Sequence, residues 1–196
     1  KGNPNNRPNS DVVKPRINAL DITKGSRKMW IIDFGPNMTL EEASKYVEPF
    51  EYVKKNVKPI RDVVRRQAHR KKWWLFGDTR PGMRKAISKL NRYIATPLVS
   101  KHRVFMWMPT NVVAENLIVV IARDDDYFFG VLHSRPHKLW SLQLGTSLED
   151  RPRYTPTSTL ETFPFPWIPG KEPKNDPLIL AISQAAKDLV EQRDRW

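Results

Sequence analysis

The sequence predicts an α+β domain with a mixed or antiparallel sheet, flanking helices and a kinked, basic helical segment. Short apolar runs rich in β-branched residues alternate with segments of helical periodicity, but without the regular strand–helix–strand rhythm of a parallel sheet. Prolines interrupt the helical pattern of the basic segment. Apolar residues make up 39% of the 196 residues, which is enough to bury a core.

Three regions are expected along the chain. Residues 1–27 are rich in Asn, Pro, Ser and Arg, and we interpret them as an arm or linker. Residues 28–170 form the predicted main domain, and residues 171–196 carry a final helix that packs on it. The chain begins with Lys1 and not with Met, so we expect it to belong to a longer protein.

The first elements follow directly after the arm. Met29–Phe34 is short, apolar and partly β-branched, and Gly35-Pro36 ends it, so we predict a buried strand. Thr39 and Glu42 have the spacing of a capping box, which predicts that a helix begins here.

Helical periodicity continues beyond that cap, since apolar residues recur at three- and four-residue spacing as far as Val64. Pro49 and Pro59 cannot occupy the interior of a straight helix. We therefore expect two or three consecutive helices, or one kinked helix, ending near Trp73. A turn at residues 77–82 and a short helix at residues 83–91 are predicted next.

The second half alternates between strand and helix signals. Strands are predicted at Tyr93–Ala95, Val104–Met108 and Leu117–Ala122, of which the last has the composition of a central, buried strand. Helices are predicted at Tyr127–Leu132, at Pro136–Leu144 with Gly145 ending it, and at Leu178–Arg195. Thr155–Pro166 is expected to be extended.

Positive charge is concentrated in one segment. Lys54 to Arg103 contains sixteen Lys or Arg residues and only two acids, Asp62 and Asp78, a net charge of +14 (sixteen minus two). The whole chain is +13, so all other residues together contribute about −1. Such a local charge indicates an anionic partner, and the backbone of a nucleic acid is the usual one.

The spacing within this segment supports phosphate binding. On a helical wheel begun at Pro59, Arg61, Arg65 and Lys72 fall in a line, and Arg66 and Arg70 flank the other side. Like charges four residues apart destabilise a helix that stands alone in water. We therefore favour phosphate contact, while a solvated basic face, or one that docks on an acidic protein, stays open as an alternative.

The predicted DNA-binding residues continue through the turns and loops after this segment. The loops Gly77–Met83 and Ser100–Arg103 are the candidates for entry into a DNA groove. The full set is Arg61, Arg65, Arg66, Arg70, Lys72, Arg80, Arg84, Lys85, Lys89, Arg92, Lys101, His102 and Arg103. Three aromatic residues, Trp73, Trp74 and Phe76, follow Arg70-Lys71-Lys72 in the sequence. We favour packing in the core for them over stacking on bases.

Few other chemistries fit the sequence. The absence of cysteine excludes disulfides and thiolate metal sites. His133 and His137 have helical spacing but no carboxylate placed as a third ligand, so no metal site is expected. Asp124-Asp125-Asp126 fits a helix cap best, with a Mg²⁺-dependent nuclease site as the alternative. A phosphate loop and a Ser/His/Asp set are also missing.

A membrane location is not expected. Apolar runs stay well short of the roughly 18 residues that a membrane span requires. Signal-peptide features are absent at the start of the sequence. We therefore expect a cytoplasmic protein.

Several motifs resemble a known family. Ile121-Ala122-Arg123-Asp124-Asp125-Asp126-Tyr127-Phe128-Phe129-Gly130 is one, and Arg153-Tyr154-Thr155-Pro156-Thr157-Ser158-Thr159, leading into Phe163-Pro164-Phe165-Pro166, is another. The segments at residues 3–13, 30–35 and 92–103 also look similar. Together they resemble the target-recognition domain of bacterial adenine-N6 DNA methyltransferases, similar to type IIG and type IIL fused restriction–modification enzymes.

The resemblance implies a specific role. Such enzymes transfer a methyl group from S-adenosylmethionine to adenine, using an Asn/Asp-Pro-Pro-Tyr/Phe motif and a glycine-rich cofactor loop. Neither occurs here, because the Asn3-Pro4 pair is followed by Asn, so no catalytic residue carries over. The resemblance implies a non-catalytic DNA-recognition module, with double-stranded DNA and the catalytic domain of the same parent chain as partners. Residues 1–27 would then link it to that upstream domain.

Overall fold

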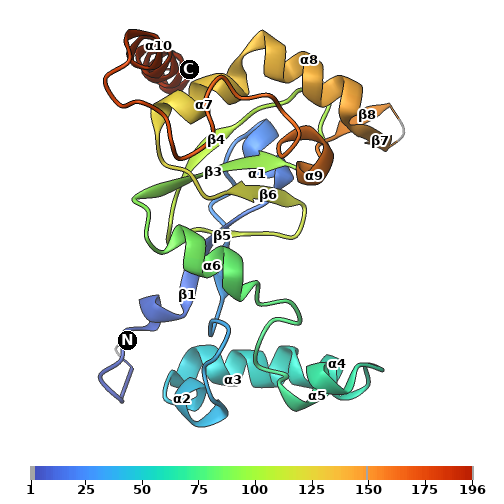
Figure 1. The fold of residues 1–196 in the computed structure, drawn as a ribbon. Coiled ribbons are helices and arrows are strands. Elements are labelled where there is room, and N and C mark those ends of the chain that lie inside the picture. The colour runs from blue at the N-terminus through green and yellow to red at the C-terminus, as the bar shows by residue number, and fades with distance from the viewer. Residues whose placement is uncertain (1–2, 149, 196) are drawn as a thin grey trace. The chain divides into compact units, whose positions relative to one another are not determined.

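The computed structural model describes residues 3–148 and 150–195, and these residues form helices and small sheets (Figure 1). Their contacts divide the chain into two compact units. Unit 1 takes the described residues up to Arg16, then Lys28–Lys85 and Asn111–Val113. Unit 2 takes Ile17–Arg27, Ala86–Thr110 and the described residues from Ala114 onward. The predicted α+β class is confirmed.

Short helices make up most of unit 1, where the sequence predicted two or three helices or a kinked one. They are α2 (Leu40–Ser44), α3 (Val47–Asn56), α4 (Lys58–Asp62) and α5 (Gln67–Lys71). The predicted capping box begins α2, since Thr39 Oγ1 accepts from Glu42 N at 3.1 Å and Glu42 Oε2 accepts from Thr39 N at 3.0 Å. Pro49 and Pro59 lie in the first turns of α3 and α4, where no helical N–H bond is lost.

The helical conformation is interrupted between α4 and α5, at residues 63–66. The helical wheel begun at Pro59 is therefore wrong, and Arg61, Arg65 and Lys72 do not form a line on one helix. A continuous helix would stack Arg61 beside Arg65 and Arg66 beside Arg70, one turn apart. The break separates Arg61 from Arg65, whereas Arg66 is the N-cap of α5 and remains one turn from Arg70, whose N–H donates to Arg66 O at 3.3 Å.

Aromatic side chains supply most of the core of unit 1. Phe34, Phe50 and Trp73 are buried, and the rings of Phe50 and Trp73 are centred 5.4 Å apart. The predicted core packing of Trp73 is confirmed. Tyr46 is buried in the same cluster, and its hydroxyl donates to Asp11 Oδ2 at 3.1 Å.

The strands of unit 1 join the start of the chain to this core. β1 (Val13–Ile17) pairs antiparallel with β2 (Trp30–Ile32), and β5 (Val113–Ala114) completes the order β2-β1-β5. The strand predicted at Met29–Phe34 is present, but its predicted burial is wrong. β2 is an edge strand of this sheet, and Trp30 is 63% exposed.

A buried ion pair stabilises unit 1 where β2 ends. Asp33, almost wholly buried, accepts from Arg84 Nη1 at 2.7 Å and from Gly35 N at 3.0 Å. Arg84 Nε also donates to Thr79 O at 2.7 Å. The guanidinium therefore ties α6 (Pro81–Ile87) and the turn before it to the end of β2.

Replacing Arg84 with alanine is expected to lower the free energy of unfolding by about 2–3 kcal/mol, because it leaves a buried carboxylate without its cation. Urea unfolding measures the loss. Arg80→Ala is the matched control, since the ion pair of Arg80 with Asp78 is exposed and contributes at most about 1 kcal/mol. Equal losses in the two variants would contradict the role of the buried pair.

Unit 2 is built on an antiparallel sheet with the order β4-β3-β6. Its strands are β4 (Met106–Pro109), β3 (Arg92–Pro97) and β6 (Ile118–Ile121). The predicted positions of all three strands are confirmed within a few residues. The prediction of a central strand at Leu117–Ala122 is wrong, because β3 is the central strand and β6 lies at an edge of this sheet.

Helices pack around this sheet (Figure 1). They are α1 (Ala19–Lys24), α7 (Asp126–His133), α8 (Arg135–Leu144), α9 (Pro156–Thr159) and α10 (Pro177–Asp194). The helices predicted at residues 127–132, 136–144 and 178–195 are confirmed. The extended path predicted for Thr155–Pro166 is wrong at its start, where α9 forms one turn with its proline at the first position.

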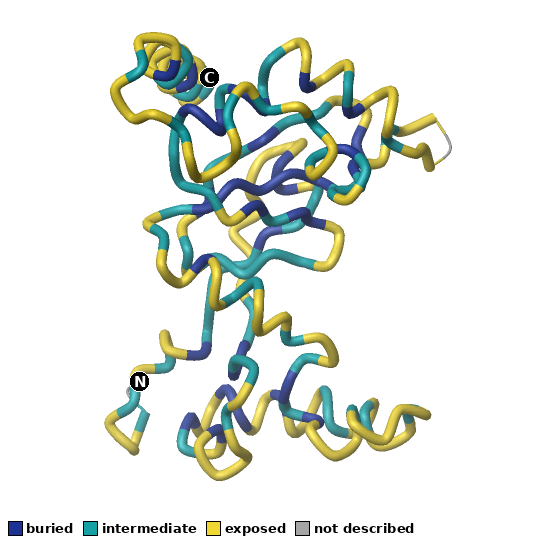
Figure 2. Tube along the Cα trace, in the orientation of Figure 1, coloured by how far each residue is buried: buried dark blue, intermediate teal, exposed yellow. Residues whose placement is uncertain are grey.

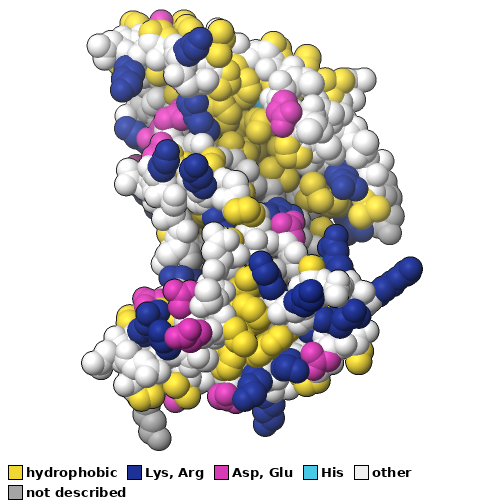
Figure 3. All heavy atoms as spheres, turned by 60° about the horizontal axis from the view of Figure 1, so that its bottom comes forward, with side chains coloured by type: hydrophobic (Ala, Val, Ile, Leu, Met, Phe, Trp, Pro, Cys, Tyr) yellow, Lys and Arg dark blue, Asp and Glu magenta, His cyan; other side chains and the backbone are white. Residues whose placement is uncertain are grey.

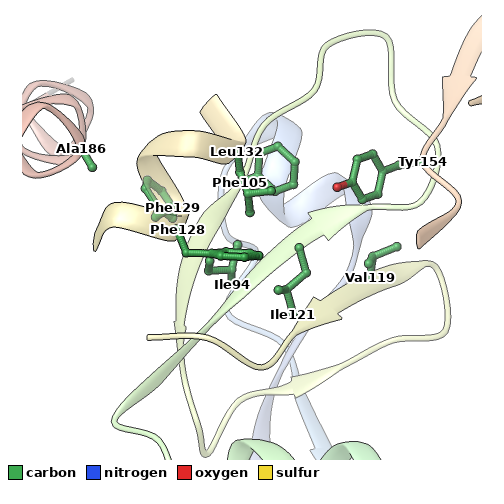
Figure 4. Close-up of a cluster of buried hydrophobic side chains, with 9 residues drawn as sticks. All are labelled: Ile94, Phe105, Val119, Ile121, Phe128, Phe129, Leu132, Tyr154 and Ala186. Atoms are coloured by element: carbon green, nitrogen blue, oxygen red, sulfur yellow. The ribbon is translucent and has the colours of Figure 1, made fainter. Parts of the chain in front are cut away.

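The core of unit 2 lies between the sheet and α7 (Figure 4). Ile94 and Ile121 face Phe128, Phe129 and Leu132 of α7, and Figure 2 shows this region as the buried part of unit 2. α10 then packs on α7. The close approach requires Gly130, since a Cβ there would lie 2.8 Å from Ile182 Cγ2.

Candidate nucleic-acid interface

Cationic side chains dominate the surface from α3 to α6 in unit 1. Twelve Lys or Arg residues and two acids lie between Lys54 and Lys85, a net charge of +10 (twelve minus two). Figure 3 shows Lys and Arg gathered over the end of unit 1 that carries α4 and α5. The exposed ones include Arg65, Arg66, Arg70, Lys71, Lys72, Arg80 and Lys85, and Arg61 is half-buried. We call residues 58–72 the α4–α5 surface.

The break in the α4–α5 surface is held by its own side chains. Arg70 Nη1 donates to Val64 O at 2.9 Å, across the break. Arg66 Nη1 lies 3.4 Å from His69 Nε2, so this guanidinium is oriented along α5. Arginine presents five N–H donors in a planar fork, so each group retains donors for a phosphate. The surface therefore offers several charged donors on one short stretch of chain.

Apolar side chains are exposed on the same surface. Ile60 is 65% exposed and Val63 is 83% exposed. Close by, Lys58 pairs with Asp62 at 2.7 Å, which neutralises one cation of the segment. The net charge of the surface therefore comes mainly from the arginines and from Lys71 and Lys72.

The first predicted groove loop, Gly77–Met83, has a defined conformation. Arg80 has a positive φ of 45°, and its N–H donates to Asp78 Oδ1 at 3.2 Å. Gly77 packs against His69, since a Cβ at this glycine would lie 2.6 Å from the imidazole. The loop therefore presents Arg80 at the surface and is tied to α5.

Three of the predicted DNA-binding arginines point into the protein. Arg84 pairs with Asp33, as described above. Arg92 lies over the ring of Trp107 at 3.7 Å and donates to Asp126 Oδ1 at 2.7 Å. Arg103 Nη1 donates to Pro97 O. The other predicted residues of unit 2, which are Lys89, Lys101 and His102, are exposed.

The predicted set is thus divided between the two units. Unit 1 holds Arg61, Arg65, Arg66, Arg70, Lys72, Arg80, Arg84 and Lys85, while unit 2 holds Lys89, Arg92, Lys101, His102 and Arg103. Arg151 and Arg153, exposed on β8 (Arg151–Arg153), did not enter the prediction. β8 pairs with β7 (Thr146–Leu148). The alternation Arg-Pro-Arg at residues 151–153 is the sequence feature that could have indicated two arginines on one face of a strand.

A buried polar chain lies behind the loop that carries Lys101. His137 Nδ1 donates to Leu132 O at 2.9 Å, so its Nε2 accepts from the Tyr154 hydroxyl at 3.1 Å. Tyr154, from one of the motifs that resemble the family, is buried. Burial lowers the pKa of His137 to about 4 and raises the pKa of Tyr154, so both groups are neutral in the folded protein at pH 7.

The depressed pKa of His137 predicts acid sensitivity. Unfolded histidine binds a proton near pH 6.5, whereas folded His137 binds one only near pH 4, so stability falls as pH decreases through that window. The free energy of unfolding is expected to change by up to about 1.4 kcal/mol per pH unit. Urea unfolding from pH 7 to pH 4 measures the slope. His137→Gln is expected to flatten it, and an unchanged slope would contradict the assignment.

The three consecutive acids have structural partners. Asp125 begins α7 by accepting from Phe128 N at 2.8 Å, which confirms the predicted cap, and it also pairs with Arg123 at 2.7 Å. Asp126 pairs with Arg92. Over residues 3–148 and 150–195 no group of three His, Cys, Asp or Glu is placed to hold a metal ion.

An apolar cavity of about 580 Å³ lies between α7, α8 and α10. Trp140, Phe163, Pro164, Ile182 and Leu189 are among its lining residues, none of which is Lys or Arg. A phosphate would not be stabilised there.

None of the helices that the described residues form is long and apolar enough to span a membrane.

Comparisons with known proteins give the family and the fold of the chain. The family model "MmeI, target recognition domain" matches residues 3–167. No curated protein sequence matches the chain. A solved structure of the type IIL restriction–modification enzyme MmeI in complex with DNA is similar to it, with a TM-score of 0.73 and 19% identity over 96% of this chain. The chain spans 24% of the length of that enzyme. The chain belongs to the MmeI target-recognition-domain family.

Proposed function

We propose that this domain recognises a specific sequence in double-stranded DNA on behalf of a restriction–modification enzyme. The α4–α5 surface supplies phosphate contacts, which fix position, while exposed loop residues supply the contacts to bases. The observation that supports this most directly is the unit 1 segment of net charge +10, whose exposed arginines meet few carboxylates. The structurally similar enzyme MmeI was solved in complex with DNA, which also supports DNA as the ligand.

The parent enzyme would be a cytoplasmic, S-adenosylmethionine-dependent adenine-N6 DNA methyltransferase, serving in restriction or phage defence. Its catalytic domain would bind the cofactor and the flipped adenine, since this sequence carries neither the catalytic motif nor the cofactor loop. This domain would contribute no reacting group. Its part is to hold the duplex in register so that the target adenine reaches the catalytic pocket of the same chain.

The proposal is tested by titrating the 196-residue chain with a mixed-sequence duplex at rising salt. Phosphate contacts release counterions, so the logarithm of the binding constant is expected to fall linearly with the logarithm of salt concentration, with a slope of about −0.9 per contact. Binding that is absent even at low salt, together with binding to an acidic protein, would instead favour the docking alternative.

A further inference from the structure

Arg103 was predicted to contact DNA, but its guanidinium faces inward. Nη1 donates to Pro97 O and to Thr96 Oγ1, the latter at 3.1 Å, and Nη2 donates to Pro152 O at 3.3 Å. One face of the group lies over the ring of Tyr154, 4.9 Å from its centre. A guanidinium with three acceptors and a covered face has little left to offer a phosphate.

These acceptors belong to two different segments of unit 2. Pro97 ends β3, and the loop that follows leads to β4. Pro152 is the middle residue of β8, beyond the β7–β8 turn. Arg103 therefore joins the two ends of its own loop and fastens them to a strand about fifty residues further along the sequence.

Backbone bonds follow the same path. Tyr154 N donates to Leu98 O at 2.8 Å, and Ser100 N donates to Pro152 O at 3.3 Å. Ser100 Oγ donates to His102 O, which closes the loop upon itself. Pro152 O thus accepts from both Ser100 N and Arg103 Nη2, so the loop has two attachments at one carbonyl.

Lys101 and His102 are exposed, and they lie between the anchored residues Ser100 and Arg103. The backbone conformation at these two residues is therefore fixed by the hydrogen bonds of the Arg103 guanidinium to Pro97 O and Pro152 O. Lysine cannot replace it, because an ammonium lacks the planar fork that spans two carbonyl oxygens and stacks on a tyrosine ring.

We infer that Arg103 is a positioning residue that fixes the loop Val99–His102 against β8, and thereby presents Lys101 to the phosphate backbone of bound DNA. The inference rests on the proposed DNA-binding function for the role of Lys101. The anchoring of the loop by Arg103 does not depend on that function, so the two parts are tested separately.

The first test uses Arg103→Lys in the 196-residue chain without DNA, with amide hydrogen exchange measured by NMR. The variant keeps the charge and loses the fork. Exchange at Ser100 and Tyr154 is expected to become at least about tenfold faster, while exchange at Ile94 in the central strand stays unchanged. Equal exchange in the two proteins at Ser100 and Tyr154 would overturn the inference. Arg103→Gln, which keeps a planar group with two N–H donors but loses the charge, serves if Arg103→Lys does not fold.

The second test measures affinity for a mixed-sequence duplex in a double-mutant cycle of Lys101→Ala and Arg103→Lys. Each single change is expected to weaken binding about three- to tenfold, and the double variant no more than Arg103→Lys alone, because both act through one loop. Wild-type affinity in Arg103→Lys, with a loss in Arg103→Ala, would identify a direct phosphate contact and overturn the inference. Faster exchange without any DNA binding by the wild-type chain would refute the proposed function and retain the anchoring.

Discussion

Replacing Arg61, Arg65, Arg66 and Arg70 together with alanine is expected to lower the affinity for duplex DNA by about 100- to 1,000-fold at physiological salt. Each phosphate contact contributes a slope of about 0.9 in the salt dependence, so the loss of four contacts reduces the slope by between about 3 and 4. Fluorescence anisotropy at several salt concentrations measures both quantities. The effect is large because these four side chains carry most of the charge of the α4–α5 surface.

The matched control removes the same charge elsewhere. Arg135, Lys138, Lys171 and Lys174 are exposed in unit 2 and lie outside the predicted set. Their combined replacement with alanine changes the net charge of the protein equally, but it removes no proposed contact. A control variant that loses as much affinity and slope as the α4–α5 variant would show that only net charge matters, and it would contradict a localised interface.

Replacing Phe129 with alanine is expected to lower the free energy of unfolding by about 3–5 kcal/mol. Phe129 is fully buried on α7, and its ring is stacked on Trp107, with centroids 4.6 Å apart. The cavity that alanine leaves lies between the sheet and α7, where the packing of α10 on the other side of that helix limits relaxation. Urea unfolding at pH 7 gives the value.

Leu139→Ala provides the comparison, because Leu139 is exposed on α8 and its truncation is expected to change stability by no more than about 0.5 kcal/mol. Phe129→Ala should also leave the DNA affinity of the folded protein unchanged, provided that binding is measured where the variant is folded. A loss below about 1 kcal/mol for Phe129→Ala would show that α7 does not close the core of unit 2.

Local signals in the sequence predicted the elements that rest on local physics. The Thr39–Glu42 capping box, the Asp125 cap and the proline-initiated α8 each use side chains within a few residues of the helix they begin. β3 and β4 were predicted from apolar, β-branched composition. The family resemblance, carried by the segment Tyr154 to Pro166 among others, gave the target-recognition assignment that the family model confirms.

Long-range pairing set the features that the sequence did not predict. β6 has the composition of a central strand, yet β3 takes that place because it pairs with strands on both sides. Arg84, Arg92 and Arg103 belong to a run of cations, but their partners Asp33, Asp126 and Pro152 lie 34 to 51 residues away. Charge density along a sequence does not distinguish an arginine that faces solvent from one that closes a core.

A hydrogen-exchange footprint of the 196-residue chain, with and without a mixed-sequence duplex at low salt, locates the DNA-binding surface most directly. Slower exchange of backbone amides is expected in residues 58–72 and in the loop that carries Lys101, with no change in α10. Protection confined to α10 or to the apolar cavity beside it, with the α4–α5 surface unchanged, would contradict the assignment of that surface as the DNA-binding face.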